Sequence, residues 1–384
     1  MSRALAVLVL IAVWALAAYS SWVVAYSGWA ATYSGWVVGY ATDYVNGTSH
    51  TDLFFMFENG TLVPLVGEVP WWVVGSGVKV SAVVDGGAAR VVGLPEALQT
   101  SPLAQSLVQS PISGPQLVTV VAAKFKDVPN EPYNYSYIHD VVFGPFPSAR
   151  DFWEYVSGGA ITLRPYYISP GWITLPKTTS DYCSSGNALF NIALDVINAL
   201  YSSGVALPDR SYLVIILNKN LTCLPEVAGE GTIRFWQFNT PYGSRLIAVS
   251  LIFHYADWLV SQPDIGVYAH ELGHNFGLQH SGTVAQEYDN VWDVMGAYRL
   301  WVNMSGWWGR TYYLLPSGLV APHLYYLGWG SLRNATAGVN WLGPRVGVYW
   351  QASDGVYTAE YKCIGRYEQY LDFCGVIFHK LGSP

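Results

Sequence analysis

The eleven residues HELGHNFGLQH, at positions 270–280, constrain the fold more than any other stretch of the sequence. On an α-helix His270 and His274 are four residues apart, so both imidazoles leave the same face, one turn apart. Two ligands of a single zinc ion need this spacing. Glu271 is turned about 100° away from His270 on such a helix, so it would reach a metal-bound water rather than the metal. The stretch therefore predicts a helix that carries a metal site.

The ends of this helix can also be predicted. It covers residues 262–277, where Pro263 and Asp264 suit the first turn and Gly277 suits a C-terminal turn with a positive φ. Once the chain reverses at Gly277, His280 can return as a third ligand. Three neutral imidazoles leave a fourth coordination position open for water, which is typical of a catalytic rather than a structural zinc site. We therefore expect one catalytic Zn²⁺.

Two motifs carry a resemblance to a known family. HELGHNFGLQH fits the pattern HExxHxxGxxH, the signature of the metzincin metallopeptidases, and YDNVWDVMG at 288–296 supplies the methionine of their Met-turn. The combination resembles the gametolysin-type branch, sharply over residues 269–296 and loosely over 116–380. The resemblance implies that the metal ligands are His270, His274 and His280, that the general base is Glu271, and that the Met-turn residue is Met295.

The resemblance also implies a fold and a mechanism. The fold is α/β (α+β), a zincin-like catalytic domain in which a twisted mixed sheet lies over the active-site helix. Zinc lowers the pKa of its bound water towards about 7 and polarises the scissile carbonyl. Glu271 takes the proton from the attacking water and delivers it to the leaving nitrogen. Tyr298, three residues after Met295, is a candidate for steadying the oxyanion.

Other polar residues near the Met-turn have structural interpretations. Asp289 and Asp293 are expected to accept backbone N–H bonds within the turn. The alternative for this region is a structural Ca²⁺ site. His323, in the segment APHLYYLGW, is expected to be structural rather than a ligand.

Few residues of the chain are charged. Asp, Glu, Lys and Arg make up 12% of the sequence, against about 25% in an average soluble protein. The net charge is −7 and no basic run occurs, so we expect no nucleic-acid partner.

The N-terminus has the pattern of an export signal. One Arg precedes an apolar run from Ala4 to about Ala18, and A-L-A at 15–17 suits cleavage. No Asp, Glu, Lys, Arg or His occurs from Ala4 through Thr42. An uncleaved anchor that reaches about residue 40 is the alternative, because about 20 apolar residues span a bilayer. The protein is therefore expected to be extracellular, or held at the cell surface by membrane association through residues 4–40.

An imperfect heptad, YSSWVVA–YSGWAAT–YSGWVVG, follows within residues 19–42. Its Tyr and Trp residues would share a face on a helix, whereas an odd period changes face at each repeat in a strand. The repeat therefore argues mildly against a strand.

Cysteines and glycosylation sequons agree with export. The chain has four cysteines, and an even count in an exported protein indicates two disulfides. Of the three connectivities we favour Cys183–Cys223 with Cys363–Cys374, because each pair closes a modest loop within one segment. Six N-x-S/T sequons predict a glycoprotein: they are Asn46, Asn59, Asn134, Asn220, Asn303 and Asn334.

The chain divides into segments of different character. Apolar runs around ENG and DGG predict hairpins, and a Pro/Ser/Gln-rich stretch predicts a linker. We expect a signal peptide at 1–18, the heptad segment at 19–42, a small all-β module at 43–95 that is a candidate pro-segment, a linker at 96–115, the catalytic domain at 116–335, and a disulfide-pinned C-terminal β segment at 336–384 that packs on it.

Two functions from different classes fit these patterns. The first is a secreted zinc endopeptidase that cleaves extracellular or envelope proteins. The second is a non-catalytic envelope adhesion or scaffold protein with a structural zinc site, which would not need Glu271. Some relatives are kept latent by a cysteine on the zinc, but no Cys precedes Cys183. If residues 19–115 are inhibitory, they must occupy the cleft as a strand or place an Asp on the metal.

Overall fold

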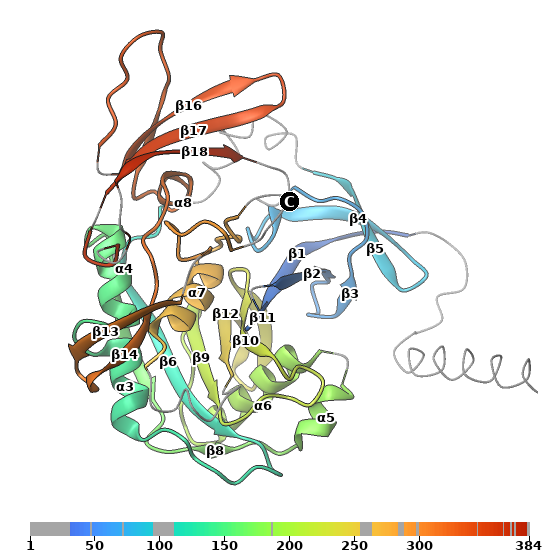
Figure 1. The fold of residues 1–384 in the computed structure, drawn as a ribbon. Coiled ribbons are helices and arrows are strands. Elements are labelled where there is room, and N and C mark those ends of the chain that lie inside the picture. The colour runs from blue at the N-terminus through green and yellow to red at the C-terminus, as the bar shows by residue number, and fades with distance from the viewer. Residues whose placement is uncertain are drawn as a thin grey trace, which may run out of the picture.

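The computed structural model describes residues 31–94, 111–253, 263–282, 288–296 and 299–381, except for 47, 71–72, 186, 344, 364, 369–370 and 372–373. The expected signal peptide, the first part of the heptad segment, most of the linker, and Tyr298 lie outside the described residues. Inside them the chain forms a 12-stranded sheet, a hairpin and a four-stranded sheet (Figure 1). No helix in this described part is long and apolar enough to cross a membrane.

Five strands form the part of the large sheet that carries the site. Their spatial order is β10-β12-β9-β6-β7, and β10 runs antiparallel to β12 while the other pairs are parallel. This mixed sheet confirms the predicted α/β fold. The strands are β6 (Gly114–Lys124), β7 (Ile161–Ile168), β9 (Ser211–Leu217), β10 (Val227–Thr232) and β12 (Gly243–Ile252), with β8 (Ile173–Thr174) and β11 (Trp236–Thr240) at their margins.

Helices cover both faces of this sheet (Figure 1). Successive side chains of a strand point to opposite faces, so Val120 and Val214 join one core while Val121 and Ile215 join the other. The first core packs against α3 (Tyr135–Phe143), α4 (Ala149–Ser157) and α7 (Ile265–Asn275), and the second against α6 (Ala188–Ser202), which follows α5 (Thr179–Cys183). Every residue of β9 is buried, so β9 is the central strand between the two cores that the unbroken apolar run predicts.

An N-terminal β module extends the same sheet. Its strands are β1 (Ala31–Tyr44), β2 (Ser49–Met56), β3 (Leu62–Pro64), β4 (Lys79–Asp85) and β5 (Ala88–Gly93). β1 pairs with β2 and β4 inside the module and with β10 of the catalytic sheet. The module also has its own small core, which includes Val37, Phe55 and Val80. Ile233 of the catalytic unit joins this core, and Val38 and Met56 of the module join the core that packs against α6, so the module packs partly on itself and partly on the rest of the chain.

The mild preference for a helix in the heptad segment is wrong where the structure describes it. Tyr33 and Trp36 lie in β1, which starts twelve residues before the expected start of the β module at 43. The glycines of the repeat give the physical reason. A Cβ at Gly39 would lie 2.7 Å from the Leu53 side chain of β2, and one at Gly35 would lie 2.5 Å from that of Phe55. These positions serve close strand contact, and pairing on both sides outweighs the seven-residue rhythm.

The C-terminal region packs on the catalytic unit above α4 and α8 (Figure 1). Its four-stranded sheet has the order β15-β16-β17-β18, and the Tyr367 hydroxyl donates to Asp151 of α4 at 2.8 Å. The structure forms disulfides between Cys183 and Cys223 and between Cys363 and Cys374. The strands of this sheet are β15 (Ser331–Asn334), β16 (Val346–Ala352), β17 (Gly355–Lys362) and β18 (Gly375–Leu381). They follow the hairpin of β13 (Leu300–Gly306) and β14 (Gly309–Leu315) and the helix α8 (Ala321–Tyr326).

Candidate metal centre

The helix that the histidine motif predicts is α7. Asp264 caps its N-terminus by accepting the Val267 N–H at 3.1 Å, so the carboxylate satisfies a donor that the first turn leaves free. The helix ends at Asn275, and Gly277 adopts a φ of +93°, the left-handed turn expected there. This turn sends the chain back along the helix, so His280 returns to the face that carries the first two histidines.

Three imidazoles and one carboxylate converge at this face. The Nε2 atoms of His274 and His280 are 3.1 Å apart. Asp43, from the end of β1, points its carboxylate at all three rings, with oxygen to Nε2 distances of 2.8 Å to His280, 3.4 Å to His270 and 3.5 Å to His274. These four residues are the group of possible metal ligands found among the described residues, and their ligand atoms all lie within 4.8 Å of one another. The sequence predicts the three histidines as ligands but does not predict Asp43 among them.

Hydrogen bonds at the Nδ1 atoms orient the three imidazole rings. Each Nδ1 has a hydrogen-bond partner, and a carbonyl oxygen can only accept, so Nδ1 of the first two rings carries the proton and Nε2 keeps its lone pair for a metal. The three bonds are His270 Nδ1 to Val294 O at 2.8 Å, His274 Nδ1 to Leu278 O at 2.9 Å, and His280 Nδ1 to Ser49 Oγ at 2.9 Å.

The donor set fits a zinc ion in chemistry and in spacing. Ligand atoms about 2.0–2.1 Å from a tetrahedral zinc lie about 3.3–3.4 Å apart, which is close to the separations at this cluster. Burial lowers the pKa of His274 to about 4, so its ring is neutral, as a ligand must be. Burial alone would raise the pKa of Asp43, but its interactions with the His270 and His280 imidazoles outweigh burial and hold that pKa well below its usual range. Asp43 Oδ2 is buried and accepts no hydrogen bond, which a cation at this place would compensate.

Glu271 lies beneath strand β10, beside the cluster. Both of its carboxylate oxygens are buried without a hydrogen-bond partner. Burial, together with the neighbouring carboxylate of Asp43, raises its pKa well above the usual range. Room for the side chain comes from two glycines of β10: a Cβ would lie 2.6 Å from Glu271 Cδ if added at Gly229, and 2.8 Å from Oε2 if added at Gly231. The sequence GEG of β10 therefore makes space for the carboxylate.

The Met-turn lies under α7 as a packed floor. Met295 is fully buried, and its sulfur lies directly against Gly273, where no side chain could fit. Asp293 accepts the Met295 N–H at 3.0 Å and pairs with His323 at 2.7 Å, and although burial opposes it, the His323 charge lowers the pKa of Asp293. These contacts support the bracing role expected for Asp293 and the structural role expected for His323, and they lend nothing to a calcium site.

Two further residues of the site are not part of the histidine motif. Asn275 is buried at the end of α7, donates to the carbonyls of Thr232 and Val249 at 2.9 and 3.0 Å, and accepts from the Ser250 hydroxyl at 2.8 Å. It therefore fixes the metal helix against β10 and β12. Tyr288 donates its hydroxyl to Asp43 Oδ1 and lies 3.2 Å from His280 Nε2.

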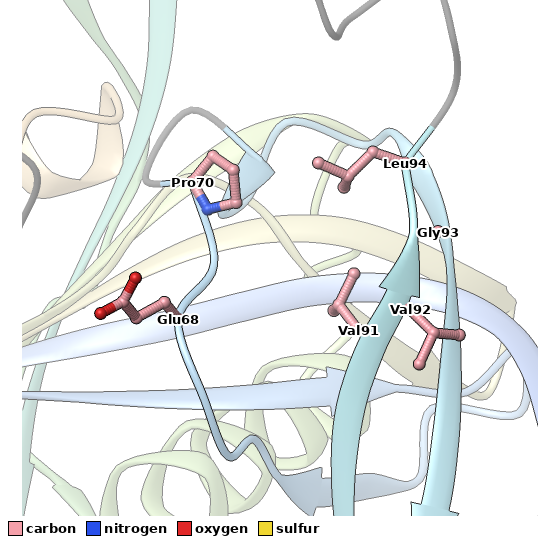
Figure 2. Close-up of a pocket in the computed structure, with 6 residues that line it drawn as sticks. All are labelled: Glu68, Pro70, Val91, Val92, Gly93 and Leu94. Carbon is pink, nitrogen blue, oxygen red and sulfur yellow. The ribbon is translucent and has the colours of Figure 1, made fainter.

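A surface hollow elsewhere offers no comparable chemistry. It has a volume of about 310 Å³ and lies on the N-terminal module. Figure 2 shows that Glu68 is the one charged side chain among the residues that line it. At the candidate metal centre Asp43, His270, Glu271 and His274 are fully buried, and His280 is partly buried.

A mixed sheet, a histidine helix, a third histidine after a glycine turn and a methionine beneath are the features that the resemblance to metallopeptidases predicts. Residues 241–314 match the family model for Gametolysin peptidase M11. The matched stretch includes β12, α7 and the Met-turn, and it confirms the resemblance to gametolysin-type metallopeptidases. A peptidase acts on protein or peptide substrates. No curated protein matches the chain.

Proposed function

We propose that this protein is a secreted zinc-dependent endopeptidase whose substrates are extracellular or envelope proteins. One observation carries the proposal: the Nε2 atoms of His270, His274 and His280 face a common point, beside the buried carboxylate of Glu271. A structural zinc site does not need such a carboxylate. The envelope scaffold alternative accounts for the histidines but leaves the burial of Glu271 without a purpose.

The proposed mechanism assigns a task to each residue. The three histidines hold the ion, which when bound acidifies a water and polarises the scissile carbonyl. Glu271 receives the proton of the attacking water and passes it to the leaving nitrogen.

The substrate is proposed to bind as an extended strand along β10, in the strand-addition mode that many peptide sites use. Two tyrosines are candidates for steadying the oxyanion. Tyr288 has its hydroxyl beside His280 Nε2, and Tyr298 follows Met295 in the sequence. Tyr288 is favoured by its place at the cluster, since an oxyanion donor must lie within hydrogen-bond reach of the reacting carbonyl.

Export is supported by the two disulfides, which persist in oxidising compartments. Among the sequons, Asn220 is buried and donates to the carbonyl of Val227 at 2.8 Å, so we propose no glycan there. Asn46, Asn59, Asn134, Asn303 and Asn334 are exposed and remain the candidates for glycosylation.

The test is peptide-bond cleavage in a mixture of proteins, with the metal content of the purified chain measured in parallel. The chain is assayed as isolated and after limited treatment with a second peptidase that is then inhibited. We expect one zinc per chain, and cleavage that a chelator abolishes and zinc restores. Glu271→Gln should keep the zinc and lose nearly all turnover, whereas Glu226→Gln, at an exposed position, should change neither. A zinc-loaded wild-type chain that cleaves nothing in either form would favour the scaffold function.

A further inference from the structure

The carboxylate of Asp43 stands where the open coordination position of the metal site would be. The three Nε2 atoms surround it at 2.8–3.5 Å, and Oδ2 is buried without a hydrogen bond. With this inference resting on the proposed function, we propose that Asp43 is a fourth ligand of the metal and that β1 thereby inhibits the chain of which it is part.

The backbone of β1 supports this proposal independently of the carboxylate. β1 pairs antiparallel with β10 from Tyr40 to Tyr44, which fills the outer edge of that strand. A peptide that adds to β10 as a strand would need the same N–H and C=O groups. β1 therefore excludes substrate twice, from the backbone edge and from the metal.

The register of this pairing aims Asp43 at the metal. Asp43 is paired with Gly229, whose missing side chain leaves space on the face where Glu271 lies, and the register shifts between Asp43 and Tyr44. Thr42, one residue earlier, points to the other face and donates to Glu230 at 2.9 Å. Side-chain contacts thus hold the strand on both faces.

The rest of the module completes the enclosure. Ser49 of β2 is the partner of His280 Nδ1 at 2.9 Å, so even the orientation of a ligand ring depends on the module. The module has its own core around Phe55 and Val80, and it contacts the catalytic unit along β1 and through Met56 of β2. Such an arrangement allows the module to leave as a unit while the three histidines stay on the catalytic unit.

The test compares Asp43→Asn with Asp85→Asn, a matched change at an exposed hairpin position of the same module. Each chain is stripped of metal and reloaded with Co²⁺, whose visible absorption reports the ligand set. We expect one Co²⁺ per chain in all three proteins, a changed spectrum for Asp43→Asn, and an unchanged one for Asp85→Asn. Peptidase activity of the full zinc-loaded chain should rise about tenfold or more in Asp43→Asn, the change that a loss of about 1.4 kcal/mol in docking free energy produces.

A second variant tests the inhibitory role of β1 without changing Asp43, in case Asp43→Asn does not fold. Thr42→Val removes the hydrogen bond to Glu230 and keeps Asp43, so the spectrum of the closed form should persist while activity rises by a smaller factor. Near-ultraviolet circular dichroism of each variant establishes that it is folded.

Each outcome decides between the two proposals. An unchanged Co²⁺ spectrum in folded Asp43→Asn would show that Asp43 is no ligand. A changed spectrum with activity lost rather than gained would make Asp43 part of the working site and overturn the inhibitory role. A changed spectrum with no peptidase activity in any variant would leave Asp43 as a ligand but refute the proposed function. A wild-type chain that binds no Co²⁺ would overturn both.

Discussion

Replacing Gly229 by alanine tests whether Glu271 acts from its position beneath β10. A Cβ at Gly229 would lie 2.6 Å from Glu271 Cδ, which is 0.8 Å short of the 3.4 Å at which ordinary contact begins. Oε1 of the same carboxylate lies nearer still, so the carboxylate must move aside by at least that distance. The backbone itself should tolerate the change, because alanine in a strand interior is favoured over glycine by about 0.5–1 kcal/mol.

The expected cost falls on catalysis. A misplacement of about 1 Å of a catalytic group can lower the rate about 10²-fold, so kcat/KM of Gly229→Ala should fall by about that factor. The metal content should not change, since none of the three nearest atoms to the added Cβ belongs to a histidine. We would measure peptide cleavage and bound zinc in the wild-type and the Asp43→Asn backgrounds, so that inhibition by Asp43 does not hide the effect.

Gly93→Ala is the matched control for this experiment. It lies in β5, and its added Cβ would meet Ser81 Cβ at an acceptable 3.4 Å. Activity and stability should therefore stay near those of the parent chain. If Gly229→Ala kept its zinc and cleaved as fast as Gly93→Ala, the assignment of Glu271 as the base beneath β10 would be refuted.

Three further predictions concern the surroundings of the site. Burial raises the pKa of Glu230 from 4.5 to about 8. The contribution of Glu230 to the free energy of unfolding is therefore full below pH 4.5 and is lost as the pH rises towards 8, by at most about 1.4 kcal/mol per pH unit. Glu230→Gln should remove this pH dependence in urea unfolding, and an unchanged pH dependence would contradict the prediction. Asn275→Ala should lower the free energy of unfolding by about 2–4 kcal/mol, since three buried hydrogen-bonding groups lose their partner, whereas Asn198→Ala on the exposed side of α6 should stay within about 0.5 kcal/mol. Tyr288→Phe, in the Asp43→Asn background, should lower kcat by about 10²- to 10³-fold with bound metal retained, and a greater loss in Tyr298→Phe would transfer the oxyanion role to that residue.

The local features of the site could be predicted from the sequence because their causes are local. The spacing of His270 and His274 follows from the helical repeat, and the return of His280 follows from the left-handed turn at Gly277. The unbroken apolar run of β9 likewise predicts a strand that is buried on both faces. For each of these, a single short stretch contains the information.

The arrangement around β1 could not be predicted in the same way, because it depends on pairing between distant segments. The heptad pattern indicates a helix, but β2, β4 and β10 offer β1 partners that no local rhythm reveals. A signal was nevertheless present. Asp43 is the first charged residue after the long uncharged run, and a lone carboxylate at the end of an apolar segment suggests a buried partner. The sequence allows an Asp on the metal but does not indicate that this Asp is residue 43.

The continuity of the large sheet from β2 through β1 into β10 has a consequence for handling the protein. Departure of the N-terminal module would uncover a row of peptide groups from Val227 to Thr232, along with the indole of Trp236, which packs near Tyr40 and Phe54. Exposed edge strands of this kind pair with strands from other molecules. Protein from which the N-terminal module has been removed should consequently aggregate at concentrations where the intact chain stays monodisperse. A short β-forming peptide that pairs with β10 in place of β1 should prevent this aggregation.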